Sequence, residues 1–295
     1  MTEVLCGIKA FDVHELFPHF LAKRLGFYAD EGLTCRVIDI TFTPDDKLPA
    51  ESYFQVACGA AYLGRREGFP FKVLLAAATR PMFWLHAQPE IESIEQLRGK
   101  RVATYPAVAP PHHFHRVLLR KHGIDPDADL EEFRWCRDDI IRLGLMREGD
   151  MDAALISSAT SPARVRRLGL RTLALAGDEV RFVTTGVATL EPIVERQPDV
   201  IAAVVRAHLR GLRAIHERPD EATEALADVI RETDDVAAET FAAIKHCYTE
   251  DGTVEADVLD AAVCEVGAEV KAGEDVAAAD LYDFSLVSAE AGAAR

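Results

Sequence analysis

The fold is decided by the stretch Gly26-Phe27-Tyr28-Ala29-Asp30-Glu31-Gly32-Leu33. Four large apolar residues precede it at helical spacing: Phe17, Phe20, Leu21 and Leu25. That spacing predicts a helix with one apolar face. Gly26 stands where a helix commonly ends in the left-handed conformation, and Gly32 permits a tight turn into the next strand. The stretch therefore predicts a helix that ends at one glycine and a strand that begins after the other.

Strand-like runs lie on both sides of this helix. Residues 4–8 precede it and residues 35–40 follow it, so the three segments together form a βαβ unit. Further strand-like runs alternate with helical patterns, at residues 53–58, 72–77, 101–105, 152–156 and 171–174. This alternation predicts a mostly parallel α/β architecture. From about residue 192 onward the pattern is wholly helical.

Length and charge exclude some classes of function. A chain of 295 residues, 49% of them hydrophobic, is long enough for one large domain or two lobes with a substantial core. The net charge of −16 argues against nucleic acid and anionic membranes as partners, because both select basic surfaces. No apolar run approaches the roughly 18 residues that a transmembrane helix needs. An anionic small ligand stays open, because a cleft can carry local positive potential on an acidic protein.

The N-terminal residues and the cysteines bear on location. Residues 1–6 have neither the basic region nor the apolar core of a signal peptide. The cysteines are scattered, with no CxxC pair: Cys6, Cys35, Cys58, Cys136, Cys247 and Cys264. Scattered single cysteines favour reduced, buried thiols over a disulfide framework. We therefore expect a cytoplasmic protein as the sequence is written, and a periplasmic or extracellular one if a signal has been removed.

Two further motifs are typical of one family of α/β proteins. Residues 97–103 read Leu-Arg-Gly-Lys-Arg-Val-Ala, and residues 149–154 read Gly-Asp-Met-Asp-Ala-Ala. Together with the N-terminal stretch, they resemble the nitrate/sulfonate/taurine type of periplasmic substrate-binding protein, a group that includes the thiamine-pyrimidine-precursor (NMT1/THI5-like) binding proteins. The resemblance spreads over more than half of the chain. It implies a type II periplasmic-binding-protein-like fold, with two Rossmann-like α/β lobes and a ligand cleft between them.

The resemblance also implies how the chain divides. The first lobe would combine residues 1–85 with residues 188–295, including the C-terminal helices, and residues 86–187 would form the second lobe. Two crossing strands, near residues 83–86 and 183–188, would join the lobes. The chain departs from the family pattern at Phe54-Gln55, where an acidic residue is usual.

If the strand ends line the cleft, the candidate ligand-binding residues follow by position. They are Phe11, Asp12, His14, Gly59, Ala60, Thr79, Arg80, Tyr105, His112, His113, Arg137, Ser157, Ser158 and Thr185. Small and hydroxylated residues at helix N-termini leave backbone N–H groups open to an anion. Each hydroxyl taken singly also fits an ordinary helix cap.

A histidine cluster departs from the family pattern, which usually has small polar residues there. Pro110-Pro111 predicts a helix start, and His112, His113 and His115 follow it, with the first and third on one face. These side chains could act as acid/base groups, stack on an aromatic ligand, or simply hydrogen-bond at a helix start. Metal binding would need a third ligand beside two helical histidines three residues apart, and only closure of the lobes could bring in His14 or Asp12, so we expect no metal site.

Other histidines are assigned by their surroundings. His19 lies between Pro18 and Phe20 within the first helix, and His208 lies on the apolar stripe of a long helix, so both are predicted to be structural. Cys6 is predicted to be a buried strand cysteine. No Walker-type loop or dinucleotide fingerprint is present, and we expect no cofactor.

Three classes of function stay open. The first is a monomeric solute-binding protein that closes two lobes around a small anionic or aromatic, heterocyclic molecule and serves an ABC-type importer. The second is a cytosolic enzyme on the same fold: a decarboxylase, dehydratase or cofactor-precursor synthase acting on a cyclic or aromatic acid. Its catalytic candidates are His14, His112, His113 and His115, with Arg80 or Arg137 orienting a carboxylate. A ligand sensor without catalysis is a third reading. The resemblance favours binding.

Overall fold

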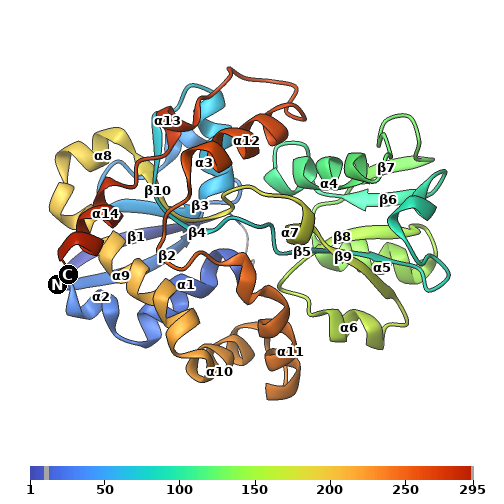
Figure 1. Ribbon diagram of the computed structural model, residues 1–295, viewed down its shortest axis with the longest axis horizontal. Helices are drawn as coiled ribbons and strands as arrows, with labels where there is room; N and C mark the ends of the chain where they lie inside the picture. Colours follow the sequence, from blue (N-terminus) through green and yellow to red (C-terminus); the bar gives the residue numbers. More distant parts are fainter. Residues whose placement is uncertain (10–12, 294–295) are drawn as a thin grey trace. The chain divides into compact units, whose positions relative to one another are not determined.

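The computed structural model describes residues 1–9 and 13–293, and the chain divides into two compact units (Figure 1). Unit 1 comprises Met1–Thr79, Phe182–Cys264 and Ala272–Arg295. Unit 2 comprises Arg80–Arg181 and Glu265–Lys271. Both units are α/β, in agreement with the predicted fold class. The chain passes between the units a few residues before the boundaries expected from the sequence, and residues 265–271, expected in the first lobe, group with unit 2.

Unit 1 is built on a five-stranded sheet with the strand order β2-β1-β3-β10-β4. Its strands are β1 (Thr2–Ile8), β2 (Leu33–Asp39), β3 (Tyr53–Ala57), β4 (Phe71–Ala78) and β10 (Thr185–Leu190). β1 runs parallel to β2 and β3, whereas β10 runs antiparallel to β3 and β4. Every residue of β3 is buried, as is typical of a strand with both faces covered.

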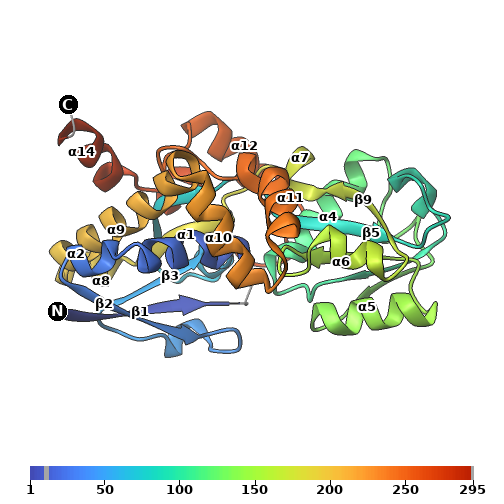
Figure 2. The same cartoon turned by 90° about the horizontal axis from the view of Figure 1, so that it is seen from below.

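The helices of unit 1 come from both ends of the chain. They are α1 (Val13–Arg24), α2 (Phe27–Asp30), α3 (Cys58–Arg66), α8 (Glu191–Arg196), α9 (Pro198–Glu217), α10 (Pro219–Ile230), α11 (Asp234–Ile244), α13 (Ala278–Leu281) and α14 (Ser285–Ala293), with 3-10 turns η1 (Asp45–Lys47) and η3 (Lys245–Cys247). α12 (Ala256–Gly267) runs across the boundary at residues 264/265. Figure 2 shows α1, α2 and α9 on the same side of β1 and β2.

The stretch that decides the fold has the predicted conformation. α1 ends at Arg24, and Gly26 adopts the left-handed conformation with φ of 79°. Gly32, with φ of 71°, makes the turn into β2, which begins at Leu33. Both glycines are therefore required by positive φ, and the predicted βαβ unit is confirmed.

Unit 2 is built on a second five-stranded sheet with the order β7-β6-β8-β5-β9. Its elements are β5 (Phe83–Ala87), η2 (Ile94–Leu97), β6 (Arg101–Thr104), α4 (Pro110–Lys121), β7 (Glu132–Trp135), α5 (Asp139–Glu148), β8 (Ala153–Ser157), α6 (Pro162–Arg167), β9 (Arg171–Leu175) and α7 (Ala176–Glu179). β6 runs parallel to β7 and β8, and β5 runs antiparallel to β8 and β9.

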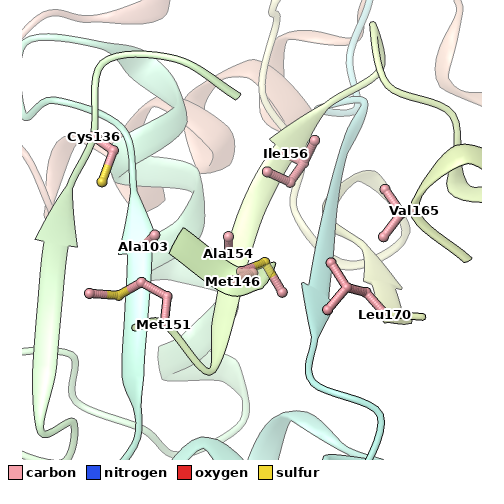
Figure 3. Close-up of a cluster of buried hydrophobic side chains, with 8 residues drawn as sticks. All are labelled: Ala103, Cys136, Met146, Met151, Ala154, Ile156, Val165 and Leu170. Atoms are coloured by element: carbon pink, nitrogen blue, oxygen red, sulfur yellow. The ribbon is translucent and has the colours of Figure 1, made fainter. Parts of the chain in front are cut away.

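The two expected crossing strands are members of the sheets. β5 follows the first passage between the units, and β10 follows the second. Each runs antiparallel to both of its neighbours, so each sheet is mixed with one reversed strand. Within unit 2, alanine, sulfur-containing and branched aliphatic side chains fill part of the core (Figure 3). They are Ala103, Cys136, Met146, Met151, Ala154, Ile156, Val165 and Leu170. Among the described residues, no helix combines the length and apolar character needed to cross a membrane.

Candidate functional site

In unit 1, four of the predicted ligand-binding residues lie at one edge of the sheet. β3 runs directly into α3, so Gly59 and Ala60 lie in the first turn of that helix. Thr79 follows the carboxyl end of β4. Thr185 begins the antiparallel β10 and pairs with Ala57 of β3 and Ala78 of β4, which places it at the same edge.

Backbone donors at this edge already have partners. The Gly59 N–H donates to the Thr184 carbonyl at 3.3 Å, and the Thr79 N–H donates to the Cys247 carbonyl at 3.2 Å. An oxyanion bound by free helix N–H groups would have to compete with these bonds. Three other predicted residues cannot be placed: Phe11 and Asp12 lie outside the described residues, and so does the side chain of His14.

In unit 2, three polar side chains converge on the carboxylate of Asp139, the first residue of α5. The Tyr105 hydroxyl, just after β6, donates to Asp139 Oδ1 at 2.9 Å. The Ser157 hydroxyl, at the end of β8, donates to Asp139 Oδ2 at 2.6 Å, and the Ser157 N–H donates to the same oxygen at 3.2 Å. Arg142 Nη2 donates to Asp139 Oδ1 at 2.5 Å. The structure thus brings the predicted Tyr105 and Ser157 together around Asp139, which lies two residues after the predicted Arg137.

Arg142 is fully buried, although its guanidinium is charged. Its guanidinium lies 3.6 Å from the centroid of the Tyr105 ring and donates to the Cys136 carbonyl at 2.6 Å. The sequence analysis missed Arg142 as a site residue. Asp138 caps α5 by accepting the Ile141 N–H at 2.9 Å, and the helix therefore starts at Asp139. Arg142 follows three residues later, so its side chain and that of Asp139 lie on the same face of the helix. That spacing is the signal that could have identified the pair.

The remaining predicted residues of unit 2 lie at the same edge. β5 is antiparallel to β8, with Phe83 opposite Ser157, so Arg80 precedes β5 at the carboxyl end of β8. Arg80 is half-buried and donates to the Gly177 carbonyl at 2.8 Å. Ser158 is buried, and Arg137 is exposed after the end of β7.

The histidines of α4 hydrogen-bond locally. His112 Nδ1 donates to the Tyr105 carbonyl at 3.0 Å, and His113 Nε2 donates to the Ala107 carbonyl at 2.9 Å. His115 Nδ1 lies 3.1 Å from Thr104 Oγ1. His112 and His115 both contact the Phe133 ring, as their shared helix face predicts, with centroids 5.4 and 5.2 Å from it. These contacts anchor the start of α4 on the ends of β6 and β7.

Burial keeps these imidazoles neutral. Desolvation, followed by the charge of His112, lowers the pKa of His115 to about 3 and that of His113 to about 4. The pKa of His112 is also lowered, mainly by desolvation. A general acid or base works best with a pKa near the operating pH, so this arrangement does not tune His115 for proton transfer near neutrality.

Exposed apolar side chains gather at the carboxyl ends of strands. Trp135 ends β7 and is 63% exposed, Val108 follows β6 and is 86% exposed, and Ile140 in the first turn of α5 is 83% exposed. Phe42 follows β2 and is also exposed, and Ile141 lies beside Ile140. Of the exposed large hydrophobic residues in the described part of the chain, only Met1 and Leu168 lie elsewhere. This concentration at the predicted ligand-binding edges was not foreseen from the sequence.

Comparison with known proteins adds to this geometry. A family model described as NMT1/THI5 like matches residues 14–222. The riboflavin-binding protein RibY of Chloroflexus aurantiacus is 24% identical over 216 residues, which cover 70% of this chain and 60% of that protein. The chain therefore spans less than two thirds of the length of this curated relative.

Solved structures share the fold at low identity. The alkanesulfonate-binding protein SsuA from Xanthomonas axonopodis pv. citri, bound to MOPS, superposes with a TM-score of 0.73 at 14% identity, over 96% of this chain and 98% of that one. The desulfurization enzyme DSZB superposes with a TM-score of 0.73 at 12% identity, over 100% of both chains. At such identities the likeness is one of fold, and this fold serves both a binding protein and an enzyme.

Proposed function

The chain belongs to the NMT1/THI5-like family, and on that premise we propose that it is a substrate-binding protein for a flat, largely apolar heterocyclic molecule. The ligand contacts the carboxyl edge of the sheet of unit 2 and is handed to the permease of an ABC-type importer. Such delivery takes place on the outer side of the cytoplasmic membrane. Riboflavin, the ligand in the name of the relative from Chloroflexus aurantiacus, represents the proposed ligand class.

The exposed apolar residues are the observation on which the proposed ligand class rests. Trp135, Val108 and Ile140 offer a large apolar surface at the edge of the sheet of unit 2. Small-molecule sites are lined mainly by apolar and aromatic side chains, with a few polar groups that fix orientation. A tryptophan left exposed at such an edge is suited to stack on an aromatic ring.

The polar groups at the same edge disfavour a small oxyanion. The buried Arg142 already has a carboxylate partner in Asp139, and this carboxylate also accepts from Tyr105 and Ser157. An incoming sulfonate would meet Asp139 as a neighbouring negative charge. A neutral ring system that hydrogen-bonds at its rim avoids this repulsion.

The remaining contacts are proposed from the sequence-predicted set. In unit 1, Gly59, Ala60, Thr79 and Thr185 share one edge and offer a surface of small and hydroxylated residues. In unit 2, Tyr105, Ser157, Ser158 and Arg80 surround the start of β5 and the end of β8. Small residues in unit 1 leave room for a ring to approach the backbone.

A titration with four probes tests the proposal. We expect riboflavin to bind with micromolar or tighter affinity and to change the tryptophan fluorescence, and MOPS, taurine and sulfate to bind at least about tenfold more weakly. Trp135→Ala should weaken riboflavin binding about tenfold or more, because aromatic contacts of this kind contribute on the order of 1–3 kcal/mol. Leu168→Ala, which removes an exposed apolar side chain outside these edges, is the matched control and should leave the affinity unchanged.

The outcomes separate the parts of the proposal. Tight binding of a sulfonate or of sulfate, without binding of riboflavin, would refute the ligand class and leave a binding function. Equal riboflavin affinity in Trp135→Ala and wild type would refute the placement of the site. Recovery of a chemically altered ligand by mass spectrometry would refute a purely binding role and favour the enzyme alternative.

A further inference from the structure

Two thiols and an imidazole meet in the core of unit 1. Cys6 comes from β1, Cys35 from β2 and His19 from α1. In the parallel register Val4 lies opposite Cys35 and Cys6 lies opposite Val37. Because side chains alternate along a strand, both thiols point to the same face of the sheet. One sulfur or nitrogen atom from each of the three residues lies within 4.8 Å of the other two, and all three side chains are buried.

The imidazole of His19 has one nitrogen without a hydrogen-bond partner. Nδ1 lies 2.9 Å from the Tyr28 hydroxyl, whereas Nε2 is buried and unpartnered among the described residues. The side chain has no exposed surface. A buried polar atom left unsatisfied costs about 1–3 kcal/mol, so its presence in the core calls for an explanation.

The Tyr28 hydroxyl links His19 to a second histidine and thereby bears on which nitrogen of His19 carries the proton. The Tyr28 hydroxyl lies between His19 Nδ1 and His208 Nδ1, at 2.9 and 3.3 Å. If Tyr28 donates to His208, then His19 Nδ1–H donates to the Tyr28 oxygen, and the lone pair of His19 is on Nε2. A neutral imidazole with a free lone pair is the form that binds a metal.

We propose that Cys6, Cys35 and His19 form a buried binding site for a thiophilic d10 metal ion, with Zn²⁺ as the representative. Two thiolates and one imidazole are soft and borderline ligands that select Zn²⁺ or Cu⁺ over Mg²⁺ and Ca²⁺. With Zn²⁺ the two thiolate charges are balanced exactly by the ion, which suits a site closed to water. Tyr28 is a positioning residue, because its hydroxyl hydrogen-bonds to His19 Nδ1 and holds the imidazole ring beside the two thiols.

The distances are compatible with this assignment. Zn–S bonds of about 2.3 Å and Zn–N bonds of about 2.0–2.1 Å place tetrahedral ligand atoms about 3.5–4 Å apart. Modest side-chain rotations would bring atoms that now lie within 4.8 Å to those separations. The three side chains are buried in the core of unit 1, so the ion would have a structural role. Because the three side chains are buried, we expect the ion to enter as unit 1 folds.

Metal analysis of the full chain tests the site. Protein expressed in zinc-supplemented medium, and protein refolded from urea with equimolar Zn²⁺, should each hold about one ion per chain after gel filtration. Elemental analysis distinguishes Zn²⁺ from Cu⁺. Refolding with Co²⁺ should give the intense near-ultraviolet absorption of thiolate-to-cobalt charge transfer. The thermal midpoint should rise when Zn²⁺ is present during refolding.

Variants assign the ligands. Cys6→Ser and Cys35→Ser should each lose the charge-transfer band and the stoichiometric ion. Tyr28→Phe keeps the shape of the side chain and should weaken Zn²⁺ binding about 10- to 100-fold while leaving the band in place at saturation. Cys136→Ala removes a buried thiol of unit 2 and is the control that should keep full loading.

The opposite results overturn the proposal. A wild-type chain that folds but holds no stoichiometric thiophilic ion by either route would refute it. So would full loading and an unchanged cobalt spectrum in both serine variants. If a serine variant fails to fold, Tyr28→Phe decides alone: an affinity for Zn²⁺ equal to that of the wild type would contradict the assignment of His19 as a ligand.

Discussion

Asp139 and Arg142 lie one helical turn apart in α5, and their side chains meet at 2.5 Å in the interior of unit 2. The Arg142 side chain is almost completely buried, and Asp139 is its carboxylate partner. Breaking a buried ion pair by removing one partner leaves an uncompensated charge, which typically costs about 3–5 kcal/mol. The pair is therefore central to the stability of the edge where the ligand is proposed to bind.

Asp139→Asn is expected to lower the free energy of unfolding of unit 2 by about 3 kcal/mol, because Arg142 loses its charge partner. Urea unfolding followed by circular dichroism measures the loss. Glu132→Gln is the matched control: it breaks the Glu132–Arg134 pair of β7, which is about 40% exposed, and should cost no more than about 1 kcal/mol. Equal losses in the two variants would contradict a stabilising role for the buried pair.

The buried histidines predict how stability depends on pH. The pKa of His115 is lowered to about 3, first by desolvation and then by neighbouring positive charge. Between the unfolded pKa of about 6.5 and the folded value, the unfolded chain binds a proton that the folded chain does not, so stability falls as the pH falls. His115→Gln should reduce this slope by about 1.4 kcal/mol per pH unit near pH 5. Unfolding free energies measured at several pH values give the slope.

His122 provides a control of opposite sign. Burial tends to lower its pKa, but hydrogen bonds with Glu95 and Glu179 outweigh burial, and the net pKa is raised. Its contribution to stability is therefore fully present below its unfolded pKa and is lost as the pH rises through the folded value. His122→Gln should steepen the loss of stability between neutral pH and about pH 6, where His115→Gln flattens it. A change of the same sign in both variants would be inconsistent with these pKa shifts.

Because α9 packs closely on α1, adding a side chain to the glycine at their contact is expected to reduce stability. A Cβ atom at Gly211 would lie 2.5 Å from the Pro18 carbonyl oxygen and 2.7 Å from the Ala22 Cβ. Gly211→Ala should therefore destabilise unit 1 by about 1–3 kcal/mol through overpacking. At Gly144, inside α5, a Cβ would meet nothing within 4 Å, and Gly144→Ala should stabilise its helix by about 0.5–1 kcal/mol. Urea midpoints of the two variants should shift in opposite directions, and a loss of stability in Gly144→Ala would contradict this reading.

The sequence predicted the fold correctly where the backbone conformation depends on the local residues alone. Gly26 and Gly32 mark the end of a helix and the start of a strand because positive φ is a local property, and both have positive φ in the structure. β7 was missed because its alternation of polar and apolar residues, over Glu132–Trp135, is only four residues long. The contacts that define the sites depend on tertiary structure. Asp139 meets Tyr105 and Ser157 only because three strands end at one edge, and Cys6 meets Cys35 only through strand register.

The Asp139 network also predicts a chemical rescue. Asp139→Ala removes the carboxylate and leaves the Arg142 guanidinium, the Tyr105 hydroxyl and the Ser157 hydroxyl facing the vacated space, which is part-exposed at Asp139. A small carboxylate or sulfonate can then supply the missing negative charge and accept the same hydrogen bonds. Added acetate or methanesulfonate should raise the urea midpoint of Asp139→Ala but not that of the wild type. Mass action at ten times the dissociation constant gives about 1.4 kcal/mol.

The control for this rescue removes the cation as well. The double variant Asp139→Ala/Arg142→Met has no charge for the anion to neutralise, so acetate should leave its midpoint unchanged, as should chloride at equal ionic strength in the single variant. Rescue of the double variant would show that the anion acts by general stabilisation. Rescue of the single variant alone would mean that Asp139 occupies the position of an anionic ligand on Arg142. In the wild type, where Asp139 already occupies that position, this edge would then bind an uncharged ligand in preference to an anion.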